Sequence, residues 1–298
     1  MYHKWGKMVV CLAIKAVFFD IDGTLLTDHR VVHQTTIAAI NQLKKQGILV
    51  GLATGRDPRF VLKYMASLSI DFVVAYNGQY IFSRDGVIFA KELQRVDMEN
   101  LIAYAQRHKQ DVTLGTATGF VGSSIMNMGM GDLSYRITRL IPSWLTRMVN
   151  LILNRWVRKL APQKSENLMG LLQQPIYQMV VLATEFETKK MQKAFPNLEF
   201  TRSSHYAADI ISKYSSKLAG IARLGESYDF SLSEVMAFGD ANNDIDMLRG
   251  VGFSVAMGNA SRKVKLAATY VTESNNRDGI FQALAAAGLV SEDEHVSE

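Results

Sequence analysis

Short, near-continuous apolar runs recur along this chain, and the first two are followed at once by an acidic or a hydroxyl side chain. The N-terminal part holds three such runs, at 12–19, 48–53 and 72–75. Runs of this kind are typical of strands that are buried on both faces, as in a parallel sheet. Between the first two, residues 33–46 have apolar side chains at helical spacing and end before Gly47. Strand, helix and strand in alternation predict an α/β fold with right-handed crossovers.

The same alternation returns in the C-terminal part of the chain. It predicts helices at 215–224, 245–249, 261–268 and 280–286, and strands at 235–238, 253–256 and 270–272. The middle differs, because residues 112–125 are rich in Thr, Ser, Gly and Val and the strand-like stretches have longer loops. We therefore expect a core domain built from 1–83 and 213–298, with an α+β module inserted at 84–212.

Composition excludes several classes of protein. The chain has 298 residues, 48% hydrophobic and 20% charged, so it is neither disordered nor fibrous and is long enough for two domains. Cys11 is the single cysteine, which fits a reducing cytoplasm. Lys15 interrupts the first apolar run, which is interpreted as a strand and not as a signal peptide. No apolar stretch reaches about 18 residues, so no membrane-spanning helix is predicted.

Positive charge is concentrated in the middle of the chain. The formal net charge is +5, and residues 84–212 hold 16 Lys/Arg against 11 Asp/Glu, so the excess lies in the insertion alone. An anionic small molecule, an anionic membrane surface or a nucleic acid could each be attracted, and a solvated face would have the same composition. The excess is mild and does not decide among these alternatives, and no nucleic-acid partner is predicted.

Two acidic residues follow the first apolar run. Asp20 comes directly after it, and Asp22 precedes Gly23. Ligands of an open parallel sheet bind beyond the carboxyl ends of its strands, so both carboxylates can face one pocket. One can attack phosphorus while the other handles the proton of the leaving group. The sequence also resembles a calcium loop, but Val31 stands where that loop needs glutamate.

A hydroxyl and a cation are the next candidates. Thr54 follows the second run, and its hydroxyl and the next backbone N–H groups can hold a phosphoryl oxygen, although an ordinary strand-to-helix turn would look the same. Lys217 lies in the first turn of a predicted helix, where a cation opposes the helix dipole unless an anion lies in front of it. Lys213 competes for this role, and either lysine could be solvated.

Oxygen ligands for a metal follow the strand predicted at 235–238. Asp240 comes after Gly239, and Asn243 and Asp244 open the next predicted helix. Such ligands suit a hard, octahedral cation such as Mg²⁺, although the same residue types also serve as helix caps. Together the four groups of residues supply what Mg²⁺-dependent phosphoryl transfer requires.

These motifs, in this order, resemble those of the haloacid dehalogenase (HAD) superfamily of hydrolases, in particular its Cof-type (class IIB) phosphatases. The four motifs are Asp20-x-Asp22-Gly23-Thr24-Leu25, Ala53-Thr54-Gly55-Arg56, Lys217, and Gly239-Asp240-x-x-Asn243-Asp244-x-x-Met247-Leu248. Three accessory stretches are also similar: Asn77-Gly78, Met257-Gly258-Asn259-Ala260 and Thr272-x-Ser274-Asn275-x-x-Asp278-Gly279. The resemblance covers about 1–83 and 205–298.

The resemblance implies a Rossmann-like, doubly wound parallel sheet with an inserted α+β cap that selects the substrate. It implies a cytoplasmic phosphatase that uses Mg²⁺ to hydrolyse a small phosphorylated metabolite, such as a sugar phosphate or a phosphorylated cofactor. Asp20 would form an aspartyl-phosphate, Asp22 would be general acid and then base, and Thr54 and Lys217 would complete the catalytic set. Phosphate or substrate would bind Thr54, Gly55, Arg56, Asn77, Lys217 and Asn243. Mg²⁺ would bind Asp20, the backbone carbonyl of Asp22, Asp240, Asn243 and Asp244.

Two other functions are compatible with these residues. A phosphomutase shares the aspartate nucleophile but returns the phosphoryl group to its product. A catalytically idle regulator, binding a ligand or a membrane surface, would draw support from residues 143–160, which form a basic amphipathic stretch. We expect the apolar stripe of that stretch to pack within the cap or against a second copy. The chain is therefore predicted to be a monomer or a homodimer, without membrane attachment.

Overall fold

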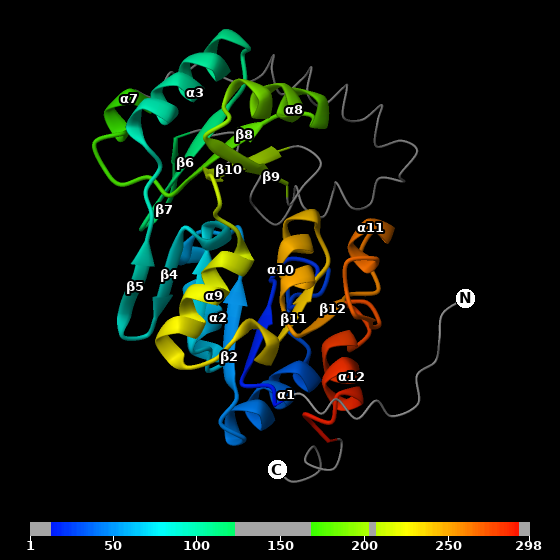
Figure 1. Cartoon of the computed structure of the whole chain (residues 1–298). Coiled ribbons are helices and arrows are strands. Elements are labelled where there is room, and N and C mark those ends of the chain that lie inside the picture. The colour runs from blue at the N-terminus through cyan, green and yellow to red at the C-terminus, as the bar shows by residue number, and fades with distance from the viewer. Residues whose placement is uncertain (1–12, 123–167, 203–206, 292–298) are drawn as a thin grey trace. The chain divides into compact units, whose positions relative to one another are not determined.

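The structure is a computed structural model that describes residues 13–122, 168–202 and 207–291 (Figure 1). It divides into a core unit, Met1–Ala90 with Ser215–Glu298, and an inserted unit, Lys91–Tyr214. Each unit has its own sheet. The amphipathic stretch expected at 143–160 lies outside the described residues. In the ranges that the structure describes, no helix combines the length and apolar character needed to cross a membrane.

The sheet of the core unit has eight strands in the order β13-β12-β11-β1-β2-β3-β4-β5. Their bounds are β1 Ala16–Phe19, β2 Leu49–Ala53, β3 Phe72–Ala75, β4 Tyr80–Ser83, β5 Gly86–Ala90, β11 Val235–Gly239, β12 Phe253–Ala256 and β13 Tyr270–Val271. The six strands from β13 to β3 are parallel, with Val17 paired to Met236 on one side and Val50 on the other. The hairpin of β4 and β5 extends the sheet antiparallel, so β5 belongs to the core sheet although the expected boundary at 83 placed it in the insertion.

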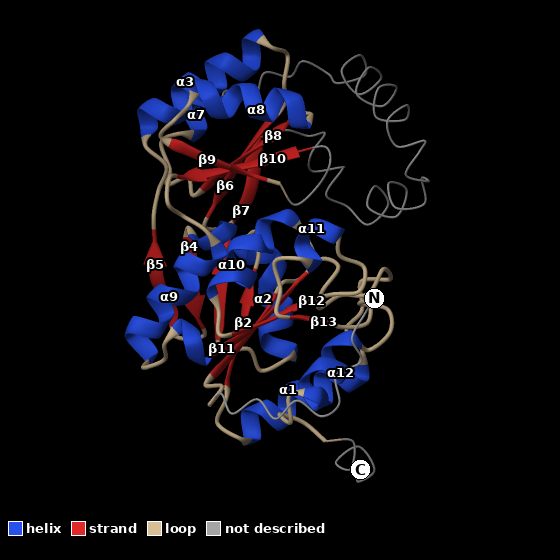
Figure 2. Ribbon diagram, turned by 45° about the vertical axis from the view of Figure 1, so that its right-hand side comes forward, coloured by secondary structure: helices blue, strands red, loops and turns tan. Residues whose placement is uncertain are grey.

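Helices cover both faces of this sheet, as Figure 2 shows, which confirms the doubly wound α/β fold. They are α1 Gln34–Lys45, α2 Pro58–Ser67, α9 Lys217–Tyr228, α10 Ile245–Gly250, α11 Arg262–Lys265 and α12 Gly279–Ala286, with short 3₁₀ turns η1 Tyr76–Gly78, η2 Leu232–Glu234 and η3 Asn242–Asp244. In α9, Ile221 joins Phe18 and Val74 in one apolar cluster. Gly220 permits this close approach, because a Cβ there would lie 2.4 Å from Val74 Cγ1.

Local sequence explains where these helices begin and end. Asp57 caps α2 by accepting a hydrogen bond from the Phe60 N–H, and Pro58 occupies the first helical position. Ser216 caps α9 in the same way, so Lys217 is the first residue of that helix. Gly47 follows α1 with a φ of +76°, the left-handed conformation that ends many helices.

The inserted unit has an antiparallel sheet in the order β7-β6-β8-β10-β9. Its elements are α3 Arg95–Arg107, β6 Val112–Thr116, β7 Gly119–Gly122, α7 Leu168–Leu171, β8 Gln178–Leu182, α8 Glu185–Ala194, β9 Leu198–Thr201 and β10 Ala207–Ser212. Buried side chains of α3 and α8, such as Leu101 and Met191, pack with Leu114 and Val181 of the sheet. The unit therefore has an α+β composition and an apolar core of its own.

Candidate active site

The carboxyl ends of three neighbouring strands carry the polar residues that the sequence singled out. Asp20 follows β1, Thr54 follows β2, and Asp240 follows β11. Since β1 lies between β2 and β11 and all three are parallel, these residues share one edge of the sheet. Burial of the apolar side chains fixes the positions of the strands. The polar residues that follow the strands are therefore held at this edge of the sheet.

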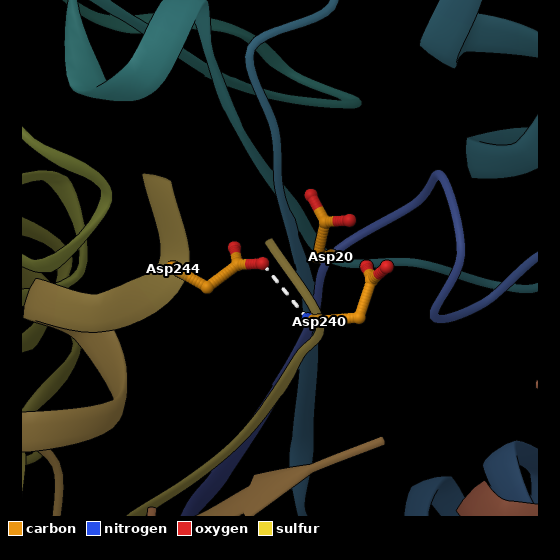
Figure 3. A group of neighbouring side chains, drawn as sticks. All are labelled: Asp20, Asp240 and Asp244. Carbon is orange, nitrogen blue, oxygen red and sulfur yellow. Dashed lines mark hydrogen bonds between the residues drawn. The ribbon is translucent and has the colours of Figure 1, made fainter. Parts of the chain in front are cut away.

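Three carboxylates gather at this edge. A ligand oxygen from each of Asp20, Asp240 and Asp244 lies within 4.8 Å of the others (Figure 3). Asp244 is fully buried, and its Oδ2 accepts the backbone N–H groups of Asp240 at 2.9 Å and Ala241 at 2.8 Å. The turn η3 therefore holds Asp244 in one orientation and ties it to the end of β11.

Lys217 links two of these carboxylates. Its Nζ donates to Oδ1 of Asp20 and, at 2.6 Å, to Oδ1 of Asp244, and its side chain is buried. Burial lowers the pKa of Lys217, but the two carboxylates outweigh this effect and raise the pKa above its usual range. These anions offset the unfavourable position of a cation in the first turn of α9. Lys213, the competing candidate, is exposed in the inserted unit.

The cluster holds more acidic than basic side chains. Burial raises the pKa of Asp20 to about 7 against the opposing effect of Lys217, and Asp244 adds repulsion. Burial and the repulsion of Asp20 and Asp244 also raise the pKa of Asp240 well above its usual value. When all three carboxylates are ionised, the single ammonium leaves two negative charges to be compensated. This charge and the all-oxygen donor set fit a hard divalent cation.

Asn243 adds a further oxygen to this region. Its Oδ1 is buried with no hydrogen-bond partner in the part of the chain that the structure describes. Its Nδ2 donates to Oδ1 of Asn77 at 3.3 Å. A buried acceptor without a donor is costly unless water or a cation approaches it, so Asn243 is consistent with a metal or phosphate site.

Asp22 is paired differently from the other acids. Arg56 donates to it twice, from Nε to Oδ2 at 2.6 Å and from Nη2 to Oδ1 at 2.9 Å. Burial raises the pKa of Asp22, but the charge and hydrogen bonds of Arg56 outweigh it and hold the pKa below its usual range. The motifs do not predict this pair, since they assign Arg56 to the substrate.

Thr54 and Gly55 follow β2, and Asn77 lies in the turn after β3. Thr54 is buried, and its Oγ1 accepts the N–H of Arg56 at 3.1 Å across Gly55. Its carbonyl accepts the N–H of Asn77 at 2.9 Å. Tyr76, Asn77 and Gly78 all have positive φ, at 50°, 52° and 98°, a costly conformation for tyrosine that functional sites often contain.

Gly78 brings this turn against α9. A Cβ on Gly78 would lie 2.2 Å from the carbonyl oxygen of Ser216, so no larger residue fits beside the cap of that helix. The turn after β3 thus sets the position of the first residue of α9, which is Lys217. Glycine is therefore required at position 78 of the accessory stretch Asn77-Gly78, because the turn contacts the backbone of Ser216. The sequence alone does not reveal this contact.

Two residues of this edge were not candidates on sequence grounds. Thr24 is buried and donates from Oγ1 to Oδ1 of Asp240 at 3.1 Å. Asn259 donates from Nδ2 to Oδ2 of Asp240 at 3.2 Å. Both lie in stretches that resemble family motifs, and Asn259 comes soon after the carboxyl end of β12, which is the signal that could have identified it.

Comparisons with known proteins show which family the chain belongs to. A family model described as haloacid dehalogenase-like hydrolase matches residues 17–284. The phosphatase-like protein YkrA of Bacillus subtilis (strain 168) is 29% identical over 276 residues, which are 93% of this chain and 98% of that protein. A HAD phosphatase of Bacteroides thetaiotaomicron has a TM-score of 0.76 at 29% identity, covering 93% of this chain and 96% of that one. A HAD subclass IIB sugar phosphatase has a TM-score of 0.74 at 26% identity, covering 93% and 100%.

The chain belongs to the haloacid dehalogenase-like hydrolases. It is therefore an enzyme with the phosphatase activity of this superfamily on small phosphorylated substrates, and it is similar to a sugar phosphatase of subclass IIB. Phosphatases of this superfamily use a divalent metal, and the cluster of Asp20, Asp240 and Asp244 has the composition of such a site.

Proposed function

We propose that this enzyme hydrolyses phosphate monoesters through a phosphorylated Asp20. The observation that carries the proposal is the buried contact of Asp20 with Lys217 at the end of β1, among two further carboxylates. Lys217 occupies Oδ1, so Oδ2 is the oxygen expected to attack phosphorus. As the new bond forms, the ester P–O bond breaks and the alcohol leaves. Lys217 then compensates charge on the transferring group.

Asp22 is proposed to move the protons. It gives a proton to the leaving oxygen, then takes one from the water whose oxygen attacks the phosphoryl-aspartate, which releases phosphate and restores the Asp20 carboxylate. In the present pair, Arg56 favours the ionised form of Asp22, which suits the second step. For the first step the pair must open. A substrate phosphate that drew Arg56 away would leave burial to raise the pKa of Asp22.

The metal is proposed to be Mg²⁺. Asp20, Asp240, Asn243, Asp244 and the backbone carbonyl of Asp22 would hold it, with Asp244 already fixed by its backbone hydrogen bonds. When bound, Mg²⁺ neutralises charge on the phosphoryl oxygens and on the nucleophile. Thr54, Gly55, Arg56 and Asn77 are proposed to bind the phosphate or the substrate.

The insertion expected at 84–212 is proposed to be the cap that selects the substrate. We infer a small phosphorylated metabolite, either a sugar phosphate or a phosphorylated cofactor. The sugar phosphatase among the similar structures supports the first of these. The basic excess within the insertion is consistent with an anionic ligand.

A screen tests this function. Phosphate release is measured with phosphorylated sugars, nucleotides and cofactors, with and without Mg²⁺, for the wild type and for Asp20→Asn. We expect Mg²⁺-dependent release by the wild type alone. No release from any substrate would contradict phosphatase activity on these classes. A phosphorylated enzyme that resists water and requires a bisphosphate activator would identify a phosphomutase instead.

A further inference from the structure

Two accessory stretches of the core unit have no role in the proposed chemistry. They are Met257-Gly258-Asn259-Ala260, after β12, and Thr272-x-Ser274-Asn275-x-x-Asp278-Gly279, after β13. Both follow parallel strands of the core sheet, so they lie at the edge that carries Asp20 and Asp240. Their hydrogen bonds reach the candidate metal site.

Asn259 connects Asp240 with the loop that follows Asp20. Its Nδ2 donates to the carbonyl oxygen of Gly23 at 2.8 Å and to Oδ2 of Asp240 at 3.2 Å. Thr24 donates to the other oxygen of the same carboxylate at 3.1 Å. Each oxygen of Asp240 thus accepts one hydrogen bond, and two donors on different oxygens fix the plane of the carboxylate.

Asn259 is itself oriented by Asn275. The backbone N–H of Asn275 donates to Oδ1 of Asn259 at 3.0 Å, which directs the Nδ2 of Asn259 toward Asp240. Asn275 is 3% exposed, and its Nδ2 donates to the carbonyl of Leu26 at 2.8 Å and to Oδ1 of Asp28 at 3.2 Å. The hydrogen-bonded chain therefore returns to the loop of the nucleophile at a second point.

Gly258 and Gly279 allow the backbone of these two stretches to pack closely. A Cβ on Gly258 would lie 2.7 Å from the backbone nitrogen of Ser274, and one on Gly279 would lie 2.2 Å from the carbonyl oxygen of Glu273. Thr272 also donates from Oγ1 to the carbonyl of Gly279 at 2.6 Å. The two loops pack backbone against backbone, which leaves Asn259 and Asn275 little freedom.

We propose that Asn259 and Asn275 are positioning residues for the divalent metal, which they do not touch. They hold Asp240 and the loop after Asp20 in the geometry that the metal requires. Asp240 lies among like charges from Asp20 and Asp244, so its carboxylate would turn away without donors to hold it. This inference rests on the proposed metal site. Partners that orient metal ligands typically change metal affinity by about 10- to 100-fold.

Calorimetric titration with Mg²⁺ alone tests the proposal on the full-length protein. We expect Asn259→Ala to weaken Mg²⁺ binding by about 10- to 100-fold. The matched control is Asn41→Ala, the same substitution at an exposed position of α1, which should bind Mg²⁺ like the wild type. Asn259→Ser, whose hydroxyl is too short to reach Asp240, is the second variant and should resemble Asn259→Ala.

Two further measurements separate positioning from a general loss of structure. Saturating Mg²⁺ should restore kcat of Asn259→Ala on p-nitrophenyl phosphate toward the wild-type value, whereas a folding defect would persist. Asn275→Ala keeps the backbone N–H that donates to Asn259 but removes the side-chain hydrogen bonds to Leu26 and Asp28, and it should weaken Mg²⁺ binding in the same direction. The double variant should lose less than the product of the two single effects, since both side chains hold the same loop after Asp20.

The outcomes are distinguishable. If the wild type binds Mg²⁺ and Asn259→Ala and Asn259→Ser bind it within threefold as tightly, the positioning role is wrong. Loss of activity without rescue by Mg²⁺ would also overturn it. If the wild type fails to bind Mg²⁺, or if Asp240→Asn binds it equally well, the proposed metal site itself fails.

Discussion

At the scale of single residues, the proposed chemistry depends on Asp20. We expect Asp20→Asn to lower kcat by about 10³-fold or more, because an amide oxygen is a poor nucleophile. The variant should fold, since the amide keeps the shape of the carboxylate and avoids the cost of burying its charge, and Lys217 keeps its ion pair with Asp244. Phosphate release and thermal unfolding are measured together. A folded variant with activity within tenfold of the wild type would rule out Asp20 as the nucleophile.

The role of Asp22 gives a second prediction at this scale. With p-nitrophenyl phosphate the leaving group needs no proton, so Asp22→Asn should still phosphorylate Asp20 but release phosphate slowly. Loss of a general base costs about 10²- to 10⁴-fold in rate. Rapid-mixing absorbance should therefore show a burst of about one nitrophenolate per enzyme, followed by slow turnover. A uniformly slow reaction without a burst would show that Asp22 does not serve the second step.

At the scale of elements, the packing of α9 against the turn after β3 positions Lys217. Gly78 has a φ of +98°, and a Cβ there would lie 2.2 Å from the backbone of Ser216. Gly47 is the matched control, because it also has a positive φ, +76°, but a Cβ there would meet nothing within 4 Å. Both alanine variants bear the strain of a left-handed residue, about 1–2 kcal/mol.

We expect Gly78→Ala to reduce the free energy of unfolding by more than Gly47→Ala and to lower kcat, since the first turn of α9 must move. Gly47→Ala should leave kcat unchanged. Denaturant unfolding measures the free energy of unfolding, and steady-state kinetics measure kcat. Equal effects of the two substitutions on stability and rate would mean that this contact does not position Lys217.

At the scale of the whole molecule, a bound divalent cation should relieve the repulsion within the carboxylate cluster. We expect excess chelator to abolish turnover, Mg²⁺ to restore it and to raise Tm, and Ca²⁺ to inhibit. Mg²⁺ binds octahedrally at about 2.0–2.1 Å, while Ca²⁺ takes more ligands at longer distances. Phosphate release and thermal unfolding at defined metal concentrations measure this. Full turnover in excess chelator would refute a metal requirement.

The division into two units leads to the last prediction. Each unit has its own apolar core, and the two connections run side by side, with Nζ of Lys91 donating to the carbonyl of Lys213 at 3.4 Å. A core in which a short Gly/Ser linker replaces the inserted unit should therefore fold. It should bind Mg²⁺ and hydrolyse p-nitrophenyl phosphate, but discriminate poorly among natural substrates. Unchanged discrimination would contradict the proposed role of the insertion.

The site residues at strand ends were predictable because each follows an apolar run in the sequence, and such a run predicts a buried strand. Asp20, Thr54 and Asp240 each follow an apolar run that had to be a strand, and parallel strands end at one edge. The β4–β5 hairpin was not predicted, since its antiparallel pairing depends on the edge that β3 offers it.

The partners of these residues were decided by the tertiary structure. The motifs did not predict that Arg56 pairs with Asp22, and Asn259 reaches Asp240 from a loop on another strand. The sequence by itself determined the α/β class, the order of the motifs and the kind of chemistry, because hydrophobic runs and reactive groups are properties of neighbouring residues. The contacts that set charge and orientation join residues distant in the chain, so only the folded sheet brings them within hydrogen-bond distance.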